Sequence, residues 1–438
     1  MQRSSVWGLS RLVGCGVARR GVTKGWVAGV WVAGGWVIAV SGGLGCTPGS
    51  ANPAPSSASA TGSAAAATLP PHDRVAKLAL GDGHSCALLA SGRVACWGDN
   101  GMGQLGNGSD QASPSPVFVN GVLDAVDLRA SRATTCVTRK TGAVACWGDN
   151  AYGQANPVFD AALTGAKTPW GVYDGTNEPP RFTPANVLRS ATPSTAAAGA
   201  RGLALGSAHG CALLGGGGVR CWGDASHGQL GVGAPSDAFE ARPVAGVPPF
   251  VEIASAQFYS CGRTAGGAVW CWGANDDRQL GTEEPGPRPR PVPGVAGASG
   301  IQLAGNRACA SLAGGRVMCW GDSLACGEDH AEPPALAPRL AGSVQFARAA
   351  AECFWCALDA RHELACDGDP IANVHFDLPS VSSVAAGIYH ACALRSDGSV
   401  WCWGGNPNGE LGRKTAKDKD PEPGVVLWPD PSPAKPLR

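Results

Sequence analysis

The spacing of the cysteines is the feature of this sequence that could do chemistry. Fourteen of the 18 cysteines form pairs in which the second residue follows the first by ten positions. The pairs are Cys86 with Cys96, Cys136 with Cys146, Cys211 with Cys221, Cys261 with Cys271, Cys309 with Cys319, Cys356 with Cys366, and Cys392 with Cys402. Paired thiols can form a disulfide or bind a metal, but zinc sites combine Cys-x2-Cys steps or Cys/His clusters into a tetrahedron. One ten-residue step per unit therefore favours disulfides and an oxidising compartment, with packed free thiols as the alternative.

Each pair lies in a stretch that predicts a β-hairpin, because short alternating apolar runs flank a small polar turn. In the first unit a three-residue loop, Ala90-Ser91-Gly92, would place Cys86 opposite Cys96 at a non-hydrogen-bonded site. Cα atoms approach there to about 4.5 Å, which a disulfide tolerates. Such loops need a positive φ at their last position. Six units have glycine there, namely Gly92, Gly142, Gly217, Gly267, Gly315 and Gly398, and His362 is the exception.

The hairpins belong to a repeat, because six of the seven pairs end in the triplet Cys-Trp-Gly. Three units share Gly-x-x-His-x-Cys-Ala-Leu before the turn. The first unit continues after the triplet with Asp-Asn-x-x-Gly-Gln-Leu-Gly, and many of these positions recur in most of the other units. This motif set resembles the repeat of the regulator of chromosome condensation family over about residues 73–430. The resemblance implies an all-β, seven-bladed β-propeller with one hairpin-centred, four-stranded sheet per blade. The added cysteine pair resembles that of secreted bacterial members.

The recurring polar and aromatic residues are interpreted as structural. His84, His209 and His390 occupy one repeat position, so we expect hydrogen bonds between blades rather than catalysis. The tryptophans of the triplets, at positions 97, 147, 222, 272, 320 and 403, are expected to pack between blades. The residues after the triplets are expected to cap turns through their side chains, and they are Asp99, Asn100, Asp149, Asn150 and Asp224. We expect no catalytic residue, no metal and no cofactor.

The end of the chain is predicted to close the ring. Later units are preceded by a Pro-x-Val-type strand, such as 114–119 or 242–247, whereas unit one begins almost at once, from Leu69. A strand of this kind follows unit seven, at 421–428. We therefore expect the C-terminal strand to complete blade one.

Residues outside the repeat pattern suggest three further features. Cys326 and Cys353, in units five and six, do not belong to a ten-residue pair, and they are predicted to form a disulfide between these neighbouring blades. Residues 155–200 form an insertion between units two and three that contains Trp170 and Tyr173. Long loops on a rigid scaffold often carry function, and a plain surface insertion is the alternative. Single units also contain candidate contact residues if these are exposed, with local packing as the alternative, and they are Trp270, Trp355 and Trp401.

The N-terminus is predicted to direct export. Residues 1–46 combine basic residues with an uncharged stretch from Gly25 to Gly45, which is typical of an export signal. Leu44-Gly45-Cys46 resembles a bacterial lipoprotein signal in which Cys46 is lipidated, and an uncleaved membrane anchor is the alternative. Residues 47–72, rich in Ala, Ser and Pro, are expected to form a disordered tether, and 431–438 a tail. We therefore expect the propeller at the bacterial outer membrane or cell surface, or secreted.

Charge and motif content narrow the function further. The 34 basic and 34 acidic residues cancel, whereas nucleic-acid binders show a basic stripe and a high pI. The sequence contains no nucleophile elbow, His-Glu-x-x-His, phosphate loop or dinucleotide fingerprint. It therefore predicts a monomeric, non-enzymatic scaffold, attached to a membrane by a lipid, that binds a protein or another envelope macromolecule but no nucleic acid. An inhibitor of an extracellular enzyme, and a hydrolase or lyase that uses the central channel, are the alternatives.

Overall fold

The computed structural model describes residues 73–156, 187–233, 238–322, 332–337, 340–349, 354–368, 374–375, 378–415 and 417–429. All of them belong to the unit from Ala64 to Arg438. They form seven four-stranded antiparallel sheets, and within each sheet the strands are neighbours in chain order.

We number the sheets as blades in chain order. Blade one contains β1 (Val75–Leu80), β2 (His84–Leu89), β3 (Val94–Gly98) and β4 (Ser113–Phe118), and blade two contains β5 (Ala125–Ser131), β6 (Thr134–Arg139), β7 (Val144–Asp149) and β8 (Val187–Pro193). Blade three contains β9 (Ala200–Leu205), β10 (His209–Leu214), β11 (Val219–Gly223) and β12 (Ala238–Pro243), and blade four contains β13 (Phe250–Ala256), β14 (Tyr259–Thr264), β15 (Val269–Gly273) and β16 (Gly286–Pro291). Blade five contains β17 (Gly300–Ala304), β18 (Arg307–Ser311), β19 (Val317–Gly321) and β20 (Glu332–Leu336). Blade six contains β21 (Ser343–Ala349), β22 (Phe354–Asp359), β23 (Leu364–Gly368) and β24 (Val374–His375). Blade seven contains β25 (Val381–Ala386), β26 (His390–Arg395), β27 (Val400–Gly405) and β28 (Lys419–Val425). A 3-10 turn, η3 (Ala313–Gly315), replaces the ordinary hairpin turn in blade five.

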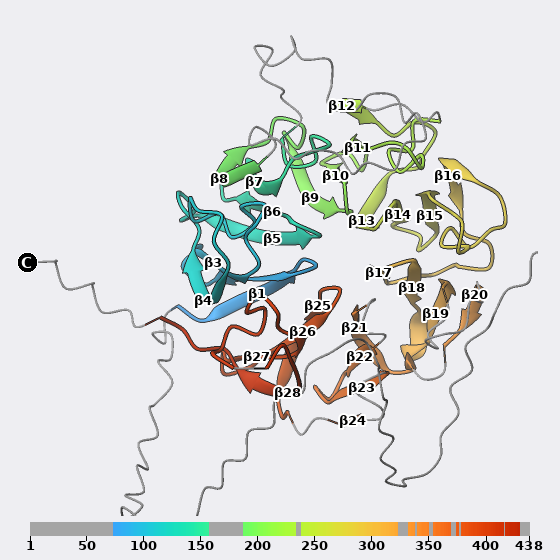
Figure 1. The fold of residues 1–438 in the computed structure, drawn as a ribbon. Helices are drawn as coiled ribbons and strands as arrows, with labels where there is room; N and C mark the ends of the chain where they lie inside the picture. The colour runs from blue at the N-terminus through green and yellow to red at the C-terminus, as the bar shows by residue number, and fades with distance from the viewer. Residues whose placement is uncertain are drawn as a thin grey trace, which may run out of the picture. The chain divides into compact units, whose positions relative to one another are not determined.

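The sheets are the blades of a propeller (Figure 1). The first strand of each blade is innermost and contacts the first strand of the next blade, and β25 contacts β1, which closes the ring. Each hydrophobic cluster lies between two neighbouring sheets, as where Leu394 and Val400 of blade seven pack with Leu89 and Trp97 of blade one. A blade buries its faces only against its neighbours. The predicted all-β, seven-bladed fold is therefore confirmed.

The hairpins have the predicted register. Cys86 pairs with Cys96 and Leu88 with Val94, and all seven ten-residue cysteine pairs are disulfides with Cα atoms 4.0–4.1 Å apart. The turn needs a positive φ at its last position, which is 89° at Gly92. His362 adopts a φ of 68° at the same position, so the turn geometry persists where glycine is missing.

The predicted route of ring closure is wrong. The C-terminal strand β28 pairs with β27 and completes blade seven, while blade one already has four strands of its own. The Pro-rich strand that precedes a hairpin in the sequence is the outermost strand of the preceding blade, as β4 is of blade one. No strand is therefore missing from blade one. The ring closes through side chains, and Trp428 packs edge-on against Trp97 with ring centroids 6.0 Å apart.

Blade six departs most from the repeat. Its fourth strand, β24, forms two residue pairs with β23, and Asp367 stands where the other blades have the triplet tryptophan. Amide side chains on the innermost strands connect this blade to its neighbours. Gln302 accepts a hydrogen bond of 2.8 Å from the backbone N–H of Phe346, and Gln345 donates one of 2.9 Å to the carbonyl of Val384.

Candidate functional site

The propeller has two faces of different character. Because the strands of a blade are antiparallel, the turn between its first and second strands lies on the same face as the connection between its third and fourth strands. We call this the loop face, and the opposite one the hairpin face. The hairpins span similar ranges, such as 90–93 and 396–399, whereas the connections on the loop face extend from 369–373 in blade six to 150–186 in blade two. Variation in length is therefore concentrated on the loop face.

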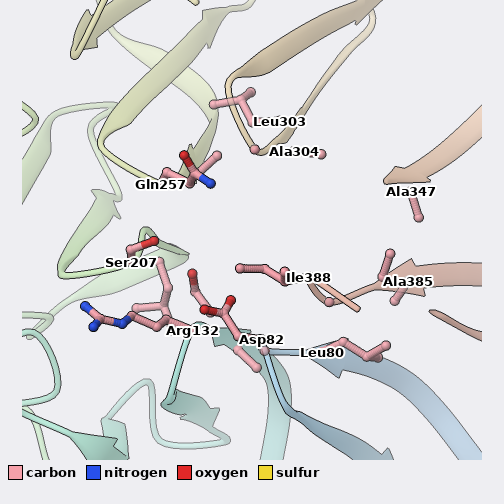
Figure 2. A pocket seen from close by; sticks show the side chains of 18 of the residues that line it. Leu80, Asp82, Arg132, Ser207, Gln257, Leu303, Ala304, Ala347, Ala385 and Ile388 are labelled. Carbon is pink, nitrogen blue, oxygen red and sulfur yellow. The ribbon is translucent and has the colours of Figure 1, made fainter. Parts of the chain in front are cut away.

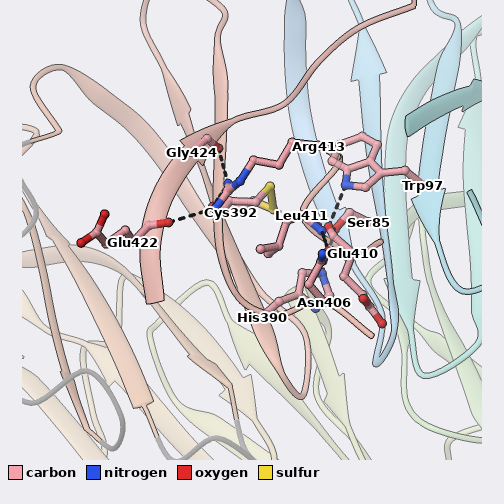
Figure 3. The surroundings of a disulfide bond; sticks show 11 residues. Ser85, Trp97, His390, Cys392, Asn406, Glu410, Leu411, Arg413, Glu422 and Gly424 are labelled. Carbon is pink, nitrogen blue, oxygen red and sulfur yellow. Dashed lines mark hydrogen bonds between the residues drawn. A yellow bond between two sulfur atoms is a disulfide. The ribbon is translucent and has the colours of Figure 1, made fainter. Parts of the chain in front are cut away.

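The triplet tryptophans bind each blade to the preceding one. In five seams the indole Nε1 donates a hydrogen bond of 2.8–3.0 Å to a backbone carbonyl in the loop of the preceding blade. The pairs are Trp147 with Gln104, Trp222 with Gln154, Trp272 with Gln229, Trp320 with Gln279, and Trp97 with Glu410. The last pair closes the ring between blades seven and one (Figure 3). The Cys-Trp-Gly motif of one blade therefore contacts the Gln-Leu-Gly motif, or its counterpart, in the preceding blade.

The repeat histidines also connect blades, as predicted. Their Nε2 atoms are hydrogen-bonded to hydroxyls of the following blade, at 2.7 Å for His84 with Thr135, 2.9 Å for His209 with Ser260, and 2.7 Å for His390 with Ser85. Burial lowers the pKa to about 4 for His84 and to about 3 for His209 and His390. These imidazoles are therefore neutral at physiological pH and serve the seams.

The polar residues after the triplets cap the long loops. The Asp99 carboxylate accepts hydrogen bonds from the backbone N–H of Gly101 at 3.0 Å and from the Gln104 side chain at 2.7 Å. The Asn100 side chain accepts one of 2.9 Å from the backbone N–H of Leu105. Asp149, Asn150 and Asp224 make the equivalent backbone contacts. The predicted capping role is confirmed, and these groups are committed to holding the loop face in shape.

A cavity of about 240 Å³ opens at the centre of the loop face. All seven innermost strands line it, and the turns that follow the first strands of blades one to five and seven form its described rim. The residue two positions before the repeat histidine, or before its counterpart, differs from blade to blade: Asp82, Arg132, Ser207, Gln257, Gly305 and Ile388. Figure 2 shows Asp82, Arg132, Ser207 and Gln257 on one side of the cavity.

The rim turns are held by backbone bonds between blades. Asp82 donates its N–H to the carbonyl of Arg132 at 2.8 Å, and Ser207 donates to Gln257 at 2.9 Å. Gly81 permits this approach, because a Cβ there would lie 2.4 Å from the carbonyl oxygen of Arg132. Arg132 has a φ of 47°, a left-handed conformation that is unfavourable for a residue with a side chain. The backbone bonds leave the rim side chains available for other partners.

Asp82 carries a perturbed charge in this cavity. Burial raises the pKa of its carboxyl group to about 6, although the Arg132 guanidinium acts in the opposite direction. No other carboxylate lines the cavity among the residues that the structure describes.

The three predicted contact tryptophans lie within the blades. Trp355 is 8% exposed and packs in the cluster that contains Val317 and Leu340. Trp270 and Trp401 are partly buried against neighbouring clusters. Trp401 also donates from Nε1 to the Ser399 hydroxyl at 3.2 Å. All three tryptophans therefore pack locally, and none of them lines the cavity.

Several predicted features fall outside the described residues. These are the lipidation residue Cys46, the proposed bridge between Cys326 and Cys353, and the insertion residues Trp170 and Tyr173. Within the described part of the chain, no group of His, Cys, Asp or Glu is arranged to hold a metal ion. In that same part, no helix has the length and apolar character needed to cross a membrane.

Sequence reasoning missed the cavity rim. It assigned the repeated positions to structure but passed over the position two residues before the histidine, where the units differ. A usable signal was present in the first unit, where Asp82 places a carboxylate between two glycines in a turn at the channel. The turn could be located from the hairpin register, whereas its convergence with the described turns of five other blades needed the three-dimensional ring.

Comparisons with known proteins agree with this architecture. Two descriptions of the Regulator of chromosome condensation (RCC1) repeat match the chain, one at residues 75–104, 201–229 and 381–410 and the other at 91–137. A search of curated proteins found no significant match.

Solved structures show the same fold. Yeast RCC1 (Prp20) bound to Kap60 has a TM-score of 0.62 and 16% identity, with 81% of this chain and 85% of that chain covered. Prp20p from Saccharomyces cerevisiae, described with its binding to Gsp1p and histones, has a TM-score of 0.61 and 17% identity over 81% and 88%. Human WBSCR16 has a TM-score of 0.51 and 22% identity over 82% and 83%. At these identities the likeness extends to the fold alone.

Proposed function

Because the chain carries repeats of the regulator of chromosome condensation family on a seven-bladed propeller, we propose that it is an exported, non-enzymatic scaffold that binds another macromolecule through its loop face. The observation that carries this proposal is that each repeat contains two kinds of position, one structural and one variable. The repeated histidines and the triplet tryptophans are buried in the seams and the caps hold the loops in shape, while length and residue type vary on the loop face. Binding sites are commonly built from variable loops on a rigid scaffold.

The proposed location is outside the cytoplasm. Seven disulfides within hairpins support an oxidising compartment, since cytosolic thiols are kept reduced. We further propose that residues 1–46 are an export signal and that Cys46 carries a lipid that attaches the propeller, through residues 47–72, to the envelope. Globomycin should then cause an unprocessed precursor to accumulate, and unchanged processing would indicate a plain signal or an uncleaved anchor instead.

Two exposed apolar residues on opposite faces provide a matched test of the binding face. Tyr389, 45% exposed, lies in the turn between β25 and β26 on the loop face, and Leu123, 70% exposed, lies in the link between β4 and β5 on the hairpin face. The 73–438 fragment is used to capture partners from envelope extracts, alongside Tyr389→Ala and Leu123→Ala. We expect Tyr389→Ala to lose the captured partner and Leu123→Ala to retain it. The reverse pattern would place binding on the hairpin face.

A further inference from the structure

The central cavity is chemically divided in two. Blades one to four contribute the polar side chains among its described lining residues, namely Asp82, Ser131, Ser207, Ser255 and Gln257 together with Arg132, and they also contribute Leu80 and Leu205. The described lining residues of blades five to seven are Leu303, Phe346, Val384 and Ile388, with alanines and glycines between them. Figure 2 shows the polar groups on one side and Ile388 pointing towards the open centre. Such a cavity fits a ligand with one polar end and one apolar side.

Asp82 is the charged group that this cavity leaves without a hydrogen-bond partner. Within the described residues no donor reaches its carboxylate, although its backbone N–H is fixed by the carbonyl of Arg132. The guanidinium of Arg132 is turned away from the open centre (Figure 2), and it does not offset the burial that raises the pKa of Asp82. A partly buried carboxylate in this state gains from a cation that supplies both charge and N–H groups.

We propose that the central cavity binds a primary ammonium group carried on an aliphatic stem. The ammonium lies at the Asp82 carboxylate, where the hydroxyls of Ser131 and Ser207 and the amide oxygen of Gln257 can accept its remaining hydrogen bonds. The methylenes lie against the apolar side formed by blades five to seven. A free alkylamine and the side chain of an exposed lysine share this chemistry. The site is independent of whether a macromolecule also docks on the loop face.

The charges around Asp82 define the expected pH dependence. The turn of blade two presents Arg132, and that of blade seven presents the uncharged Ile388. His84, on the blade of Asp82 itself, is neutral because burial lowers its pKa to about 4. Among the described residues that line the cavity, Asp82 is therefore the group that titrates near neutral pH, with a pKa of about 6. Below that pH the carboxyl group takes up a proton and the affinity for the ammonium should fall about tenfold per pH unit.

Two variants separate binding from folding. Asp82→Asn removes the charge with little change in shape and should weaken binding at pH 8 by about tenfold or more. Arg132→Gly removes a competing cation from a position with a φ of 47°, and Gly305 occupies the equivalent position in blade five with a φ of 57°. This variant should raise the melting temperature and also bind the ammonium more tightly. A structural role of the rim would not produce opposite effects on binding from the two changes.

The test uses the full chain with two probes, n-butylammonium and the peptide acetyl-Gly-Lys-Gly-amide, titrated by calorimetry at pH 5 and pH 8, with n-butanol as the neutral control. We expect saturable binding of a probe at pH 8, binding about tenfold weaker at pH 5 and about tenfold or more weaker in Asp82→Asn, and no binding of n-butanol. Tighter binding of the amine indicates a small-molecule ligand, and tighter binding of the peptide indicates a lysine side chain. No saturable binding of either probe, or equal binding by Asp82→Asn, would overturn the proposal.

Discussion

At the residue scale, one change within the repeat alters the electrostatics of the closing seam. In blade one the Gln104 side chain donates a 2.7 Å hydrogen bond to Asp99. Glu410 takes the glutamine position in blade seven, where Gly405 replaces the aspartate. Glu410 is 1% exposed and accepts two hydrogen bonds of 2.9 Å from Asn408. Burial raises the pKa of Glu410, and Asp99 across the seam adds to the effect.

Glu410→Gln is therefore expected to stabilise the protein at neutral pH. The pKa of Glu410 is higher in the folded chain than in the unfolded chain, so ionisation at higher pH disfavours the folded state. The advantage of the variant should grow as the pH rises through the raised pKa and vanish below about pH 4, where the carboxyl group is protonated in both states. Urea midpoints from pH 4 to 8 measure this difference. A gap that is constant with pH would contradict the assignment.

Gln229→Glu is the matched control for that experiment. The Gln229 side chain donates a 2.7 Å hydrogen bond to Asp224, so the new carboxylate would face a second carboxylate instead of donating to it. We expect this variant to lose stability as the pH rises. Equal pH profiles for the variant and the parent would indicate that the seam tolerates charge.

Trp97→Phe tests the hydrogen bond between the triplet and the loop of the preceding blade. The change keeps an aromatic ring but removes the 2.8 Å bond from Nε1 to the carbonyl of Glu410, in a seam where Trp97 is fully buried. The free energy of unfolding should fall by about 1–3 kcal/mol. Trp401→Phe is the control, because Trp401 is partly buried and donates to Ser399 within its own blade. Equal losses in the two variants would show that ring volume, not the hydrogen bond between blades, decides the cost.

At the element scale, the hairpin is the part that the sequence predicts best, for a local reason. Its register follows from ten residues, in which Cys86 and Cys96 are equidistant from a turn that ends in Gly92. The fourth strand is harder to assign, since Ser113–Phe118 is joined to its hairpin by a long loop and pairs with irregular register. Its blade depends on pairing across that loop, which periodicity does not reveal. The rim of the cavity was missed for a similar reason, because it is assembled from separate blades.

Removing a disulfide tests how much the hairpin depends on it. In Cys86→Ala/Cys96→Ala, the cross-link that joins β2 to β3 is lost while both positions remain small and apolar. The free energy of unfolding should fall by about 2–3 kcal/mol, since a short loop of the unfolded chain is no longer closed. Chemical denaturation of the parent and the variant under non-reducing conditions measures the loss. Under reducing conditions the difference should shrink, and a difference that is unaffected by reductant would point to packing instead.

At the scale of the whole molecule, the ring is closed by side chains instead of a shared strand. The side-chain interactions that join blades seven and one include His390 with Ser85, Ser85 with the carbonyl of Glu410, Trp97 with the same carbonyl, and Trp428 with Trp97. Copy number and fold could be predicted because they depend on counting repeats. The mode of closure could not, because it depends on which end of the repeat supplies the outermost strand.

The segment after β27 should therefore stabilise the ring through blade seven and the closing seam together. Deleting residues 417–438 removes β28 as well as Val426 and Trp428, which are 1% and 7% exposed in the cluster shared with blade one. Trp428→Ala alone should lower the free energy of unfolding by about 3–5 kcal/mol, and the deletion by more. Calorimetry should show a lower melting temperature for both, whereas deletion of 431–438 is the control and should leave it unchanged. An unchanged melting temperature in the 417–438 deletion would mean that this segment does not stabilise blade seven or the closing seam. The hydrogen bond between His390 and Ser85 would then be the contact that closes the ring.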